Sequence, residues 1–283
     1  MNFYVIDQNW FRSDDFAKRL EQPDGVQFVI TDTALLEMFK GEKWEYTSSR
    51  SLKAAADHPE RIEVSEAPCD LLRKEVHSRT PITPSAVISK DLTSRFRLYL
   101  SEMKTQGILG PRHDYIRKHI TQAQIDLTHQ QQDHPRNLAM LRRCHEAIKT
   151  DLGATFVSAA RKGSLEQSAL EQDVIVPAMR SAKDILTENG VPVSEAKDFL
   201  KYDSFLLRHG LTYLLLALRW VSQGGIESLP AEKATNDLRD MEYVLIASYG
   251  TGILTTEVKV SNLLADLRKC LDILATPTSA INN

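Results

Sequence analysis

Short apolar runs stand at both ends of this chain, where the pattern predicts buried β-strands. Three of these runs, Phe3–Ile6, Val26–Ile30 and Ile62–Val64, are rich in aromatic and β-branched residues. A fourth predicted strand, Ile253–Thr255, lies near the carboxyl terminus. Helical spacing of apolar residues follows each of the first two strands. Strands that alternate with helices in this way are typical of an α/β fold with a parallel sheet.

The middle of the chain has a different pattern. From residue 86 to residue 230 apolar residues recur at helical intervals, and no strand-like alternation appears. After it we expect a helix from about Asn236 to Tyr249, a turn at Gly250-Thr251-Gly252, and a closing helix over Ser261–Leu274. The simplest fold is an α/β core, residues 1–85 and 231–283, interrupted by an all-helical insertion, residues 86–230.

Composition and charge limit where the protein is expected to act, but they do not indicate its activity. The chain has 283 residues, and its formal net charge of -3 gives no overall attraction to a polyanion. Its three cysteines show no spacing typical of a metal site or a disulfide framework. The amino terminus lacks the features of a signal peptide, and the apolar stretch Leu211–Val221 is too short to span a bilayer. We therefore expect a cytoplasmic protein with no membrane association.

Acidic residues occupy positions where an α/β sheet places its ligands. Asp7 ends the first predicted strand, and Glu257 follows the last. Glu37 lies on the helix after the second strand, for which Asp32 is the predicted N-cap, and Asp240 lies on the helix before the last strand. Carboxylates at the carboxyl ends of parallel strands meet at one edge of the sheet, where they repel one another. A divalent cation that prefers oxygen ligands relieves such repulsion.

The order of these acids resembles a PIN-like nuclease domain. The resemblance rests on a strand that ends in Asp, Val5-Ile6-Asp7-Gln8-Asn9, and on an acid, Glu37, on an early helix. Near the end, Asn236-Asp237-Leu238-Arg239-Asp240-Met241-Glu242-Tyr243 and then Gly252-Ile253-Leu254-Thr255-Thr256-Glu257 are similar to the family's last helix and strand. The family usually has Asp where this chain has Glu257. The resemblance covers the outer parts of the chain and leaves the middle out.

The resemblance implies a nuclease that depends on Mg²⁺ or Mn²⁺, and it favours RNA over DNA as the substrate. Two divalent cations activate water and stabilise the leaving oxygen in phosphodiester hydrolysis. Asp7, Glu37 and Asp240 are the predicted catalytic metal ligands, and Asp237 and Glu257 are further candidate ligands. Glu242 is left out, because helical geometry turns it about 160° from Asp240. Asn9 and Thr255 are predicted to orient a ligand or a phosphate oxygen. Proteins of this family often act as toxins or in phage defence, under an inhibitory protein partner.

A basic stretch in the helical insertion is the predicted substrate surface. Arg112, Arg117 and Lys118 lie close together in the sequence, with tyrosines nearby. Basic residues beside aromatic ones suit a nucleic-acid backbone and stacked bases. The alternative is an ordinary solvated helix face. The insertion is also a candidate contact for a protein partner or for a second copy of the chain.

Other interpretations of the same residues remain open. Asp7 suits a cap after the first strand, and Asp237 and Asp240 suit first-turn acids that a helix dipole favours. The chain would then be a non-enzymatic protein-interaction module on a PIN-like scaffold. A third hypothesis is a metal-dependent phosphohydrolase that acts on mononucleotides.

Overall fold

The computed structural model describes residues 2–39, 43–107, 170–200, 204–222 and 230–276, with isolated residues between 108 and 169. The chain forms two compact units, and several helices contribute residues to both. We call them the first unit, Met1–Asp70, Thr83–His134 and Glu242–Ser261, and the second unit, Leu71–Ile82, Pro135–Met241 and Asn262–Asn283.

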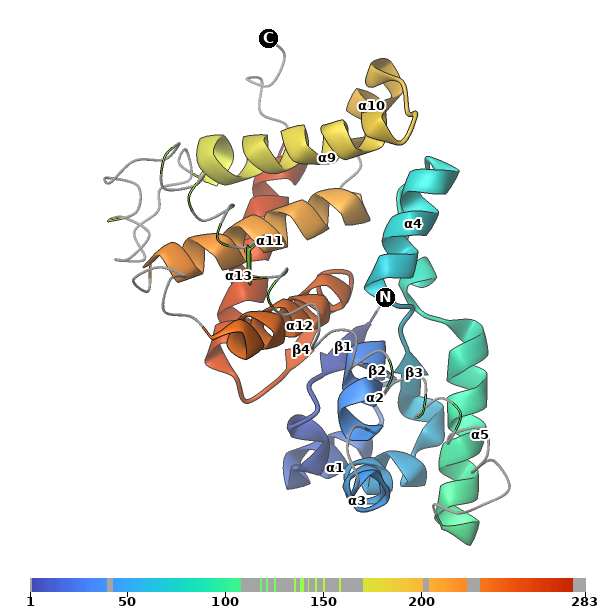
Figure 1. Ribbon diagram of the computed structural model, residues 1–283. Coiled ribbons are helices and arrows are strands. Elements are labelled where there is room, and N and C mark those ends of the chain that lie inside the picture. The colour runs from blue at the N-terminus through green and yellow to red at the C-terminus, as the bar shows by residue number, and fades with distance from the viewer. Residues whose placement is uncertain are drawn as a thin grey trace. The chain divides into compact units, whose positions relative to one another are not determined.

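A four-stranded parallel sheet forms the centre of the first unit (Figure 1). Its strands are β1 (Phe3–Ile6), β2 (Gln27–Ile30), β3 (Ile62–Val64) and β4 (Gly252–Leu254). The order across the sheet is β3-β2-β1-β4, and every neighbouring pair is parallel. The four predicted strands and the parallel α/β class are therefore confirmed. The sheet joins the two ends of the chain, because β1 pairs directly with β4.

Apolar side chains bury this sheet. Val5 and Ile6 of β1 and all of the last three residues of β2 are fully buried, as expected for parallel strands that are covered on both faces. Phe16 packs edge-on against Phe28 of β2, with 5.6 Å between the ring centroids, and against Phe11 at 5.2 Å. These aromatic contacts explain why the short strands are stable, since each ring removes a large apolar area from water.

Gly250 and Gly252 lie in the predicted turn. Glycine is required there for the turn and also because the backbone passes close to β1. A Cβ atom on Gly250 would stand 2.7 Å from the carbonyl oxygen of Phe3, and one on Gly252 would stand 3.1 Å from the ring of Tyr4. The Thr251 N–H donates to the carbonyl oxygen of Phe3 over 2.7 Å. Glycine therefore permits the close approach that pairs β4 with β1.

Helices pack around the sheet within the first unit. They are α1 (Asp14–Leu20), α2 (Asp32–Phe39), α3 (Trp44–Asp57) and α5 (Lys90–Gln106). The prediction that Asp32 caps α2 is wrong. The hydroxyl of Thr31 accepts the N–H of Ala34 over 3.1 Å, so Thr31 is the N-cap and Asp32 is the first helical residue.

The described part of the second unit is helical. It contains residues of α4 (Pro68–Ser78), a π-helical turn (Glu171–Ile175), α9 (Val176–Glu188), α10 (Val193–Phe199), α11 (Phe205–Ser222), α12 (Ala231–Ala247) and α13 (Val258–Ala275). The predicted buried helix Leu211–Val221 lies within α11. Among the described helices, none combines the length and the apolar character needed to cross a bilayer.

The start of α12 differs from the prediction. The helix begins at Ala231, five residues before the expected Asn236, and its first-turn acid is Glu232. Asp237 and Asp240 therefore lie inside the helix. The interpretation that they are first-turn acids favoured by the helix dipole is wrong.

A buried carboxylate fixes α4 to α11 within the second unit. Glu75 has no exposed surface. It accepts the N–H of Phe205 at 2.7 Å, that of Leu206 at 2.6 Å and that of Ile82 at 2.9 Å. The first two donors are the opening N–H groups of α11, which have no partner inside the helix. The carboxylate also lies at the positive end of that helix dipole, which stabilises its negative charge.

We expect Glu75→Gln to destabilise the second unit. The amide would replace one carboxylate oxygen by a donor that faces a backbone N–H, and hydrogen bonds to a charged group would be lost. The expected cost is about 3 kcal/mol in the free energy of unfolding, as measured by urea denaturation. Glu232→Gln, an exposed acid on α12, is the matched control and should cost little. An equal effect of the two substitutions would contradict the assigned role of Glu75.

Candidate functional site

The candidate site lies at the carboxyl edge of the sheet in the first unit. Asp7, Thr31, Ser65 and Thr255 each directly follow a strand, so polar side chains stand at the end of all four strands. The chain proceeds from β1 to β2 and β3 on one side of β1, whereas β4 lies on the other side. The strand order therefore reverses between β1 and β4. Open α/β sheets bind ligands at the carboxyl side of such a switch point.

Asp7 occupies this switch point. Its backbone N–H donates to the carbonyl oxygen of Leu254 over 3.0 Å, which extends the pairing of β1 with β4. Its carboxylate accepts the hydroxyl of Thr255 at 2.7 Å on Oδ2 and the backbone N–H of Asn9 at 3.3 Å on Oδ1. The predicted group of Asp7, Asn9 and Thr255 is thus brought together, although Asn9 contributes its backbone and is itself exposed.

The environment of Asp7 disfavours its charge. The residue is 8% exposed. Burial raises the pKa of Asp7 above its ordinary value, and the negative charge of Glu257 raises it further. The hydrogen bonds from Thr255 and Asn9 act in the opposite direction without cancelling the effect of burial. A nearby cation would favour the ionised form of this carboxylate.

Glu257 is the second carboxylate of this edge. Its backbone N–H donates to the hydroxyl of Thr255 over 3.0 Å, so Thr255 links the two acids. The carboxylate of Glu257 forms an ion pair with Lys259 at 3.2 Å. Glu257 is half-buried, and Lys259 is exposed enough for the pair to rearrange when another cation enters.

Glu37 is held by a residue that the sequence did not single out. The hydroxyl of Tyr243, on the part of α12 that belongs to the first unit, donates to Oε2 of Glu37 over 3.0 Å. On the same two helices, the hydroxyl of Thr33 donates to Glu242. Glu242 was left out of the predicted site. Both contacts tie α2 to α12, and they fix the orientation of Glu37.

Two predicted ligands, Asp237 and Asp240, belong to the second unit. Asp237 is 5% exposed, and its carboxylate accepts the indole N–H of Trp220 over 2.8 Å. Its charge, with that of Asp266, favours the charged form of Arg219, whose pKa burial lowers. Asp237 thus has hydrogen-bonding and ionic neighbours within its own unit. The metal roles of Asp237 and Asp240 stay predictions.

The predicted basic surface lies mostly outside the described residues. Arg112 and Arg117 are not among them. Lys118 is described as a helical, exposed residue. Exposure suits both a substrate contact and a solvated helix face, so both interpretations of the stretch stay open.

Asp32 is a half-buried acid of this edge that was not among the predicted ligands. Its Oδ1 atom is buried and has no hydrogen-bond partner. Burial raises the pKa of Asp32 to about 6, and the negative charge of Asp70 contributes to the increase. The signal was present in the sequence, because Asp32 lies two residues after β2, close to the position that Asp7 has directly after β1. Because Asp32 was assigned as the N-cap of α2, it was not considered as a ligand.

The donors at the switch point fit a hard divalent cation. Asp7 and Glu257 supply carboxylate oxygens, and Thr255 supplies a hydroxyl. Mg²⁺ and Mn²⁺ prefer such oxygen ligands and bind through one or two carboxylates together with water and substrate phosphates. Within the ranges that the structure describes, no three His, Cys, Asp or Glu side chains form a metal-binding group by themselves.

Comparison with known proteins gives no match. No family model fits the sequence, and neither a curated protein nor a solved structure is significantly similar to the chain. The resemblance to PIN-like nucleases therefore rests on the sequence motifs alone.

We expect Asp32→Asn to stabilise the protein at neutral pH. Because the folded-state pKa of about 6 exceeds the ordinary value of 3.8, folding retains a proton that the unfolded chain releases. Wild-type stability therefore falls as pH rises from 3.8 to about 6, by up to about 3 kcal/mol, and Asn removes this loss. Urea denaturation at about pH 4 and about pH 7.5 measures the gain, which should appear at the higher pH alone.

Asp14→Asn is the matched control for this prediction. Asp14 is the first residue of α1, as Asp32 is of α2, but it is exposed. Its replacement removes a favourable helix-dipole contact and should not stabilise the protein at either pH. A gain in Asp32→Asn that is the same at both pH values would sink the electrostatic explanation.

Proposed function

We propose that this chain is a divalent-metal-dependent nuclease that hydrolyses phosphodiester bonds in RNA, with its active site at the carboxyl edge of the first unit's sheet. The observation that carries the proposal is the buried carboxylate of Asp7, held by Thr255 at the β1–β4 switch point beside Glu257. A buried carboxylate with a raised pKa beside a second acid is a poor structural element, and functional sites are where such arrangements gather.

The contacts of each site residue suggest its role in this proposal. Asp7 and Glu257 would hold Mg²⁺ or Mn²⁺, and Glu37 of the same unit is a further ligand that the resemblance implies. When bound, such ions polarise a phosphoryl oxygen and lower the pKa of a bound water. Thr255 donates to Oδ2 of Asp7 and so fixes the direction of that carboxylate. Tyr243 does the same for Glu37.

RNA is the substrate in this proposal because the motifs resemble PIN-like ribonucleases. The basic stretch around Lys118 supplies attraction for the phosphate backbone, which the net charge of -3 does not. The same resemblance supports a role as a toxin or phage-defence effector under a regulatory protein. The chain itself contributes the acids and the basic residues, and the partner is an inference from the family.

Asp7→Asn should abolish both metal binding and cleavage. Replacing the acid removes a negative oxygen ligand, so the increase in melting temperature that Mn²⁺ gives the wild type should be lost. Without metal the variant should melt at or above the wild-type temperature, because a carboxylate with a raised pKa no longer has to ionise. Differential scanning fluorimetry with Mn²⁺ and cleavage of labelled RNA measure the two effects.

Asp15→Asn, an exposed acid that pairs with Lys18 on α1, is the control and should keep both the metal response and the cleavage. Labelled DNA and mononucleotides, assayed beside RNA, separate the competing functions. No Mn²⁺ response in the wild type would favour the non-enzymatic interaction module. Hydrolysis confined to mononucleotides would favour the phosphohydrolase.

Reversing the charge of Arg112, Arg117 and Lys118 together should weaken RNA binding. Each contact with a phosphate releases counterions from the RNA when the protein binds. Each contact that is lost should therefore make the plot of log affinity against log salt concentration shallower, by roughly one unit of slope. Fluorescence anisotropy of labelled RNA over a series of salt concentrations measures the slope. An unchanged slope would assign the three residues to a solvated helix face.

A further inference from the structure

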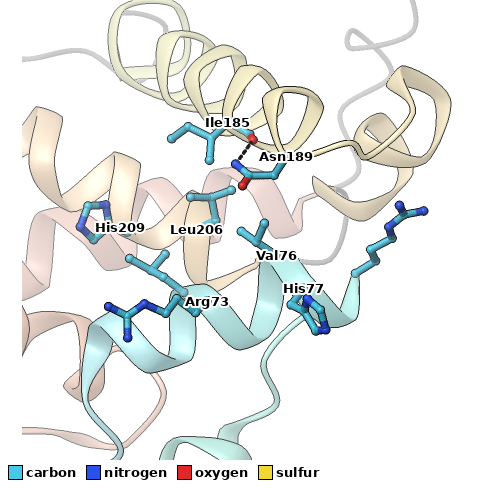
Figure 2. A pocket seen from close by; sticks show the side chains of 9 residues that line it. Arg73, Val76, His77, Ile185, Asn189, Leu206 and His209 are labelled. Carbon is cyan, nitrogen blue, oxygen red and sulfur yellow. Dashed lines mark hydrogen bonds between the residues drawn. The ribbon is translucent and has the colours of Figure 1, made fainter.

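A pocket of about 640 Å³ opens within the second unit, between α4, α9 and α11 (Figure 2). Its volume lies in the range of sites that bind small organic molecules, which is roughly 300–1,000 Å³. All of its lining residues belong to one unit. The pocket is therefore a feature of the second unit alone, and it is independent of the nuclease proposal.

One part of the pocket wall is apolar. Val76 of α4, Ile185 of α9 and Leu206 of α11 approach one another across the cavity (Figure 2). Ile185 is 38% exposed although it is a large aliphatic residue. An apolar group that entered the pocket would remove part of that surface from water, which is favourable by about 25 cal/mol per Å².

The rest of the wall is basic. Arg73 and Arg79 are cationic, His77 and His209 add imidazole groups, and none of the nine lining residues is acidic. Burial lowers the pKa of His209, so its imidazole is neutral at neutral pH and can offer a donor N–H to a ligand. An anion that entered would find cations and donors but no carboxylate among the lining residues.

Arg79 is held at the rim by its neighbours. Its guanidinium donates to the carbonyl oxygen of Gly190 at 3.1 Å and to Glu195 at 3.3 Å. Its backbone has a φ of +54°, a left-handed conformation that non-glycine residues seldom adopt. Arg79 therefore has structural contacts of its own, and Arg73 is the other arginine of the lining.

Two walls of the pocket are locked together. Glu75 lies on α4 between the lining residues Arg73 and Val76, and its carboxylate accepts the N–H of Leu206, a lining residue of α11, at 2.6 Å. Opposite, the side-chain amide of Asn189 donates to the carbonyl oxygen of Ile185 over 2.8 Å (Figure 2). Such fixed walls reduce the entropy that binding costs.

We propose that this pocket binds a small organic anion, with the apolar body of the ligand against Val76, Ile185 and Leu206 and its charged group toward Arg73. The apolar wall alone would accept any hydrophobic molecule, and the basic residues alone would accept inorganic phosphate. Both features on one cavity select a molecule that carries both, such as an aromatic carboxylate.

Isothermal titration calorimetry of the full chain tests this with three probes. They are the naphthoate anion, the neutral naphthamide of nearly the same shape, and inorganic phosphate. Naphthoate should bind at least about tenfold more tightly than either of the others, which corresponds to about 1.4 kcal/mol. Equal affinity for naphthoate and naphthamide would overturn the proposal, and so would the absence of any naphthoate binding.

Two pairs of variants locate the site. Arg73→Gln should weaken naphthoate binding by about tenfold, the effect of losing one charge-assisted contact. Arg180→Gln, an exposed residue of α9 that does not line the pocket, should leave it unchanged. Ile185→Glu should weaken naphthoate binding more than Ile185→Gln, because the two side chains differ in charge and not in size.

The naphthoate affinities of these variants support or overturn the assignment of the site. Arg73 and Ile185 are exposed, so the variants should fold, and wild-type melting temperatures would show that they do. An effect of Arg73→Gln that is no larger than that of Arg180→Gln would overturn the assignment of the site. Equal naphthoate affinities for Ile185→Glu and Ile185→Gln would do the same.

Discussion

The pairing of β1 with β4 is the constraint on which the first unit depends. It brings together residues that are 248 positions apart, such as Asp7 and Thr255. Closing so long a loop costs entropy, but that cost grows only with the logarithm of loop length. The parallel register is fixed by buried apolar residues of β1 and by the close approach of Gly250 and Gly252. A slip by one residue would turn every β1 side chain to the opposite face of the sheet.

This register also creates the candidate site, at a cost to stability. When β1 and β4 are paired, Asp7 is buried next to Thr255 and within the electrostatic influence of Glu257. Asp32, which follows β2, is half-buried, and its Oδ1 atom is buried without a hydrogen-bond partner. Both residues have raised pKa values, so the folded chain gains nothing from their ionisation. Local conflict of this kind is expected where a fold is shaped by function.

The elements of the sheet could be predicted because each strand is a short, continuous apolar run with its own sequence signal. Asp7 and Thr255 could be predicted to meet, since parallel strands end at one edge. The cap of α2 was less predictable, because Thr31 and Asp32 both have the right chemistry and only the backbone conformation decides between them. The start of α12 was missed because five polar or small residues precede its apolar pattern.

Contacts between helices that are far apart in the sequence could not be predicted. Nothing in the sequence around Glu75 indicates that its carboxylate binds N–H groups 130 residues away. The same holds for Tyr243 and Glu37, which are separated by 206 positions. Such contacts depend on how helices pack, and helical spacing reports only which face of a helix is apolar.

The two units present charges of opposite sign at their candidate sites: acids at the sheet edge and arginines at the pocket. The net charge of -3 does not reveal this difference. At the sheet edge of the first unit, two acids lie together, and a cation would relieve their repulsion. In the second unit the carboxylate of Glu75 accepts three backbone N–H groups, two of them at the start of α11. The positive end of that helix dipole stabilises this buried charge. The lining of the neighbouring pocket adds two arginines and no acid, so the same unit that buries a carboxylate also presents cations to a ligand.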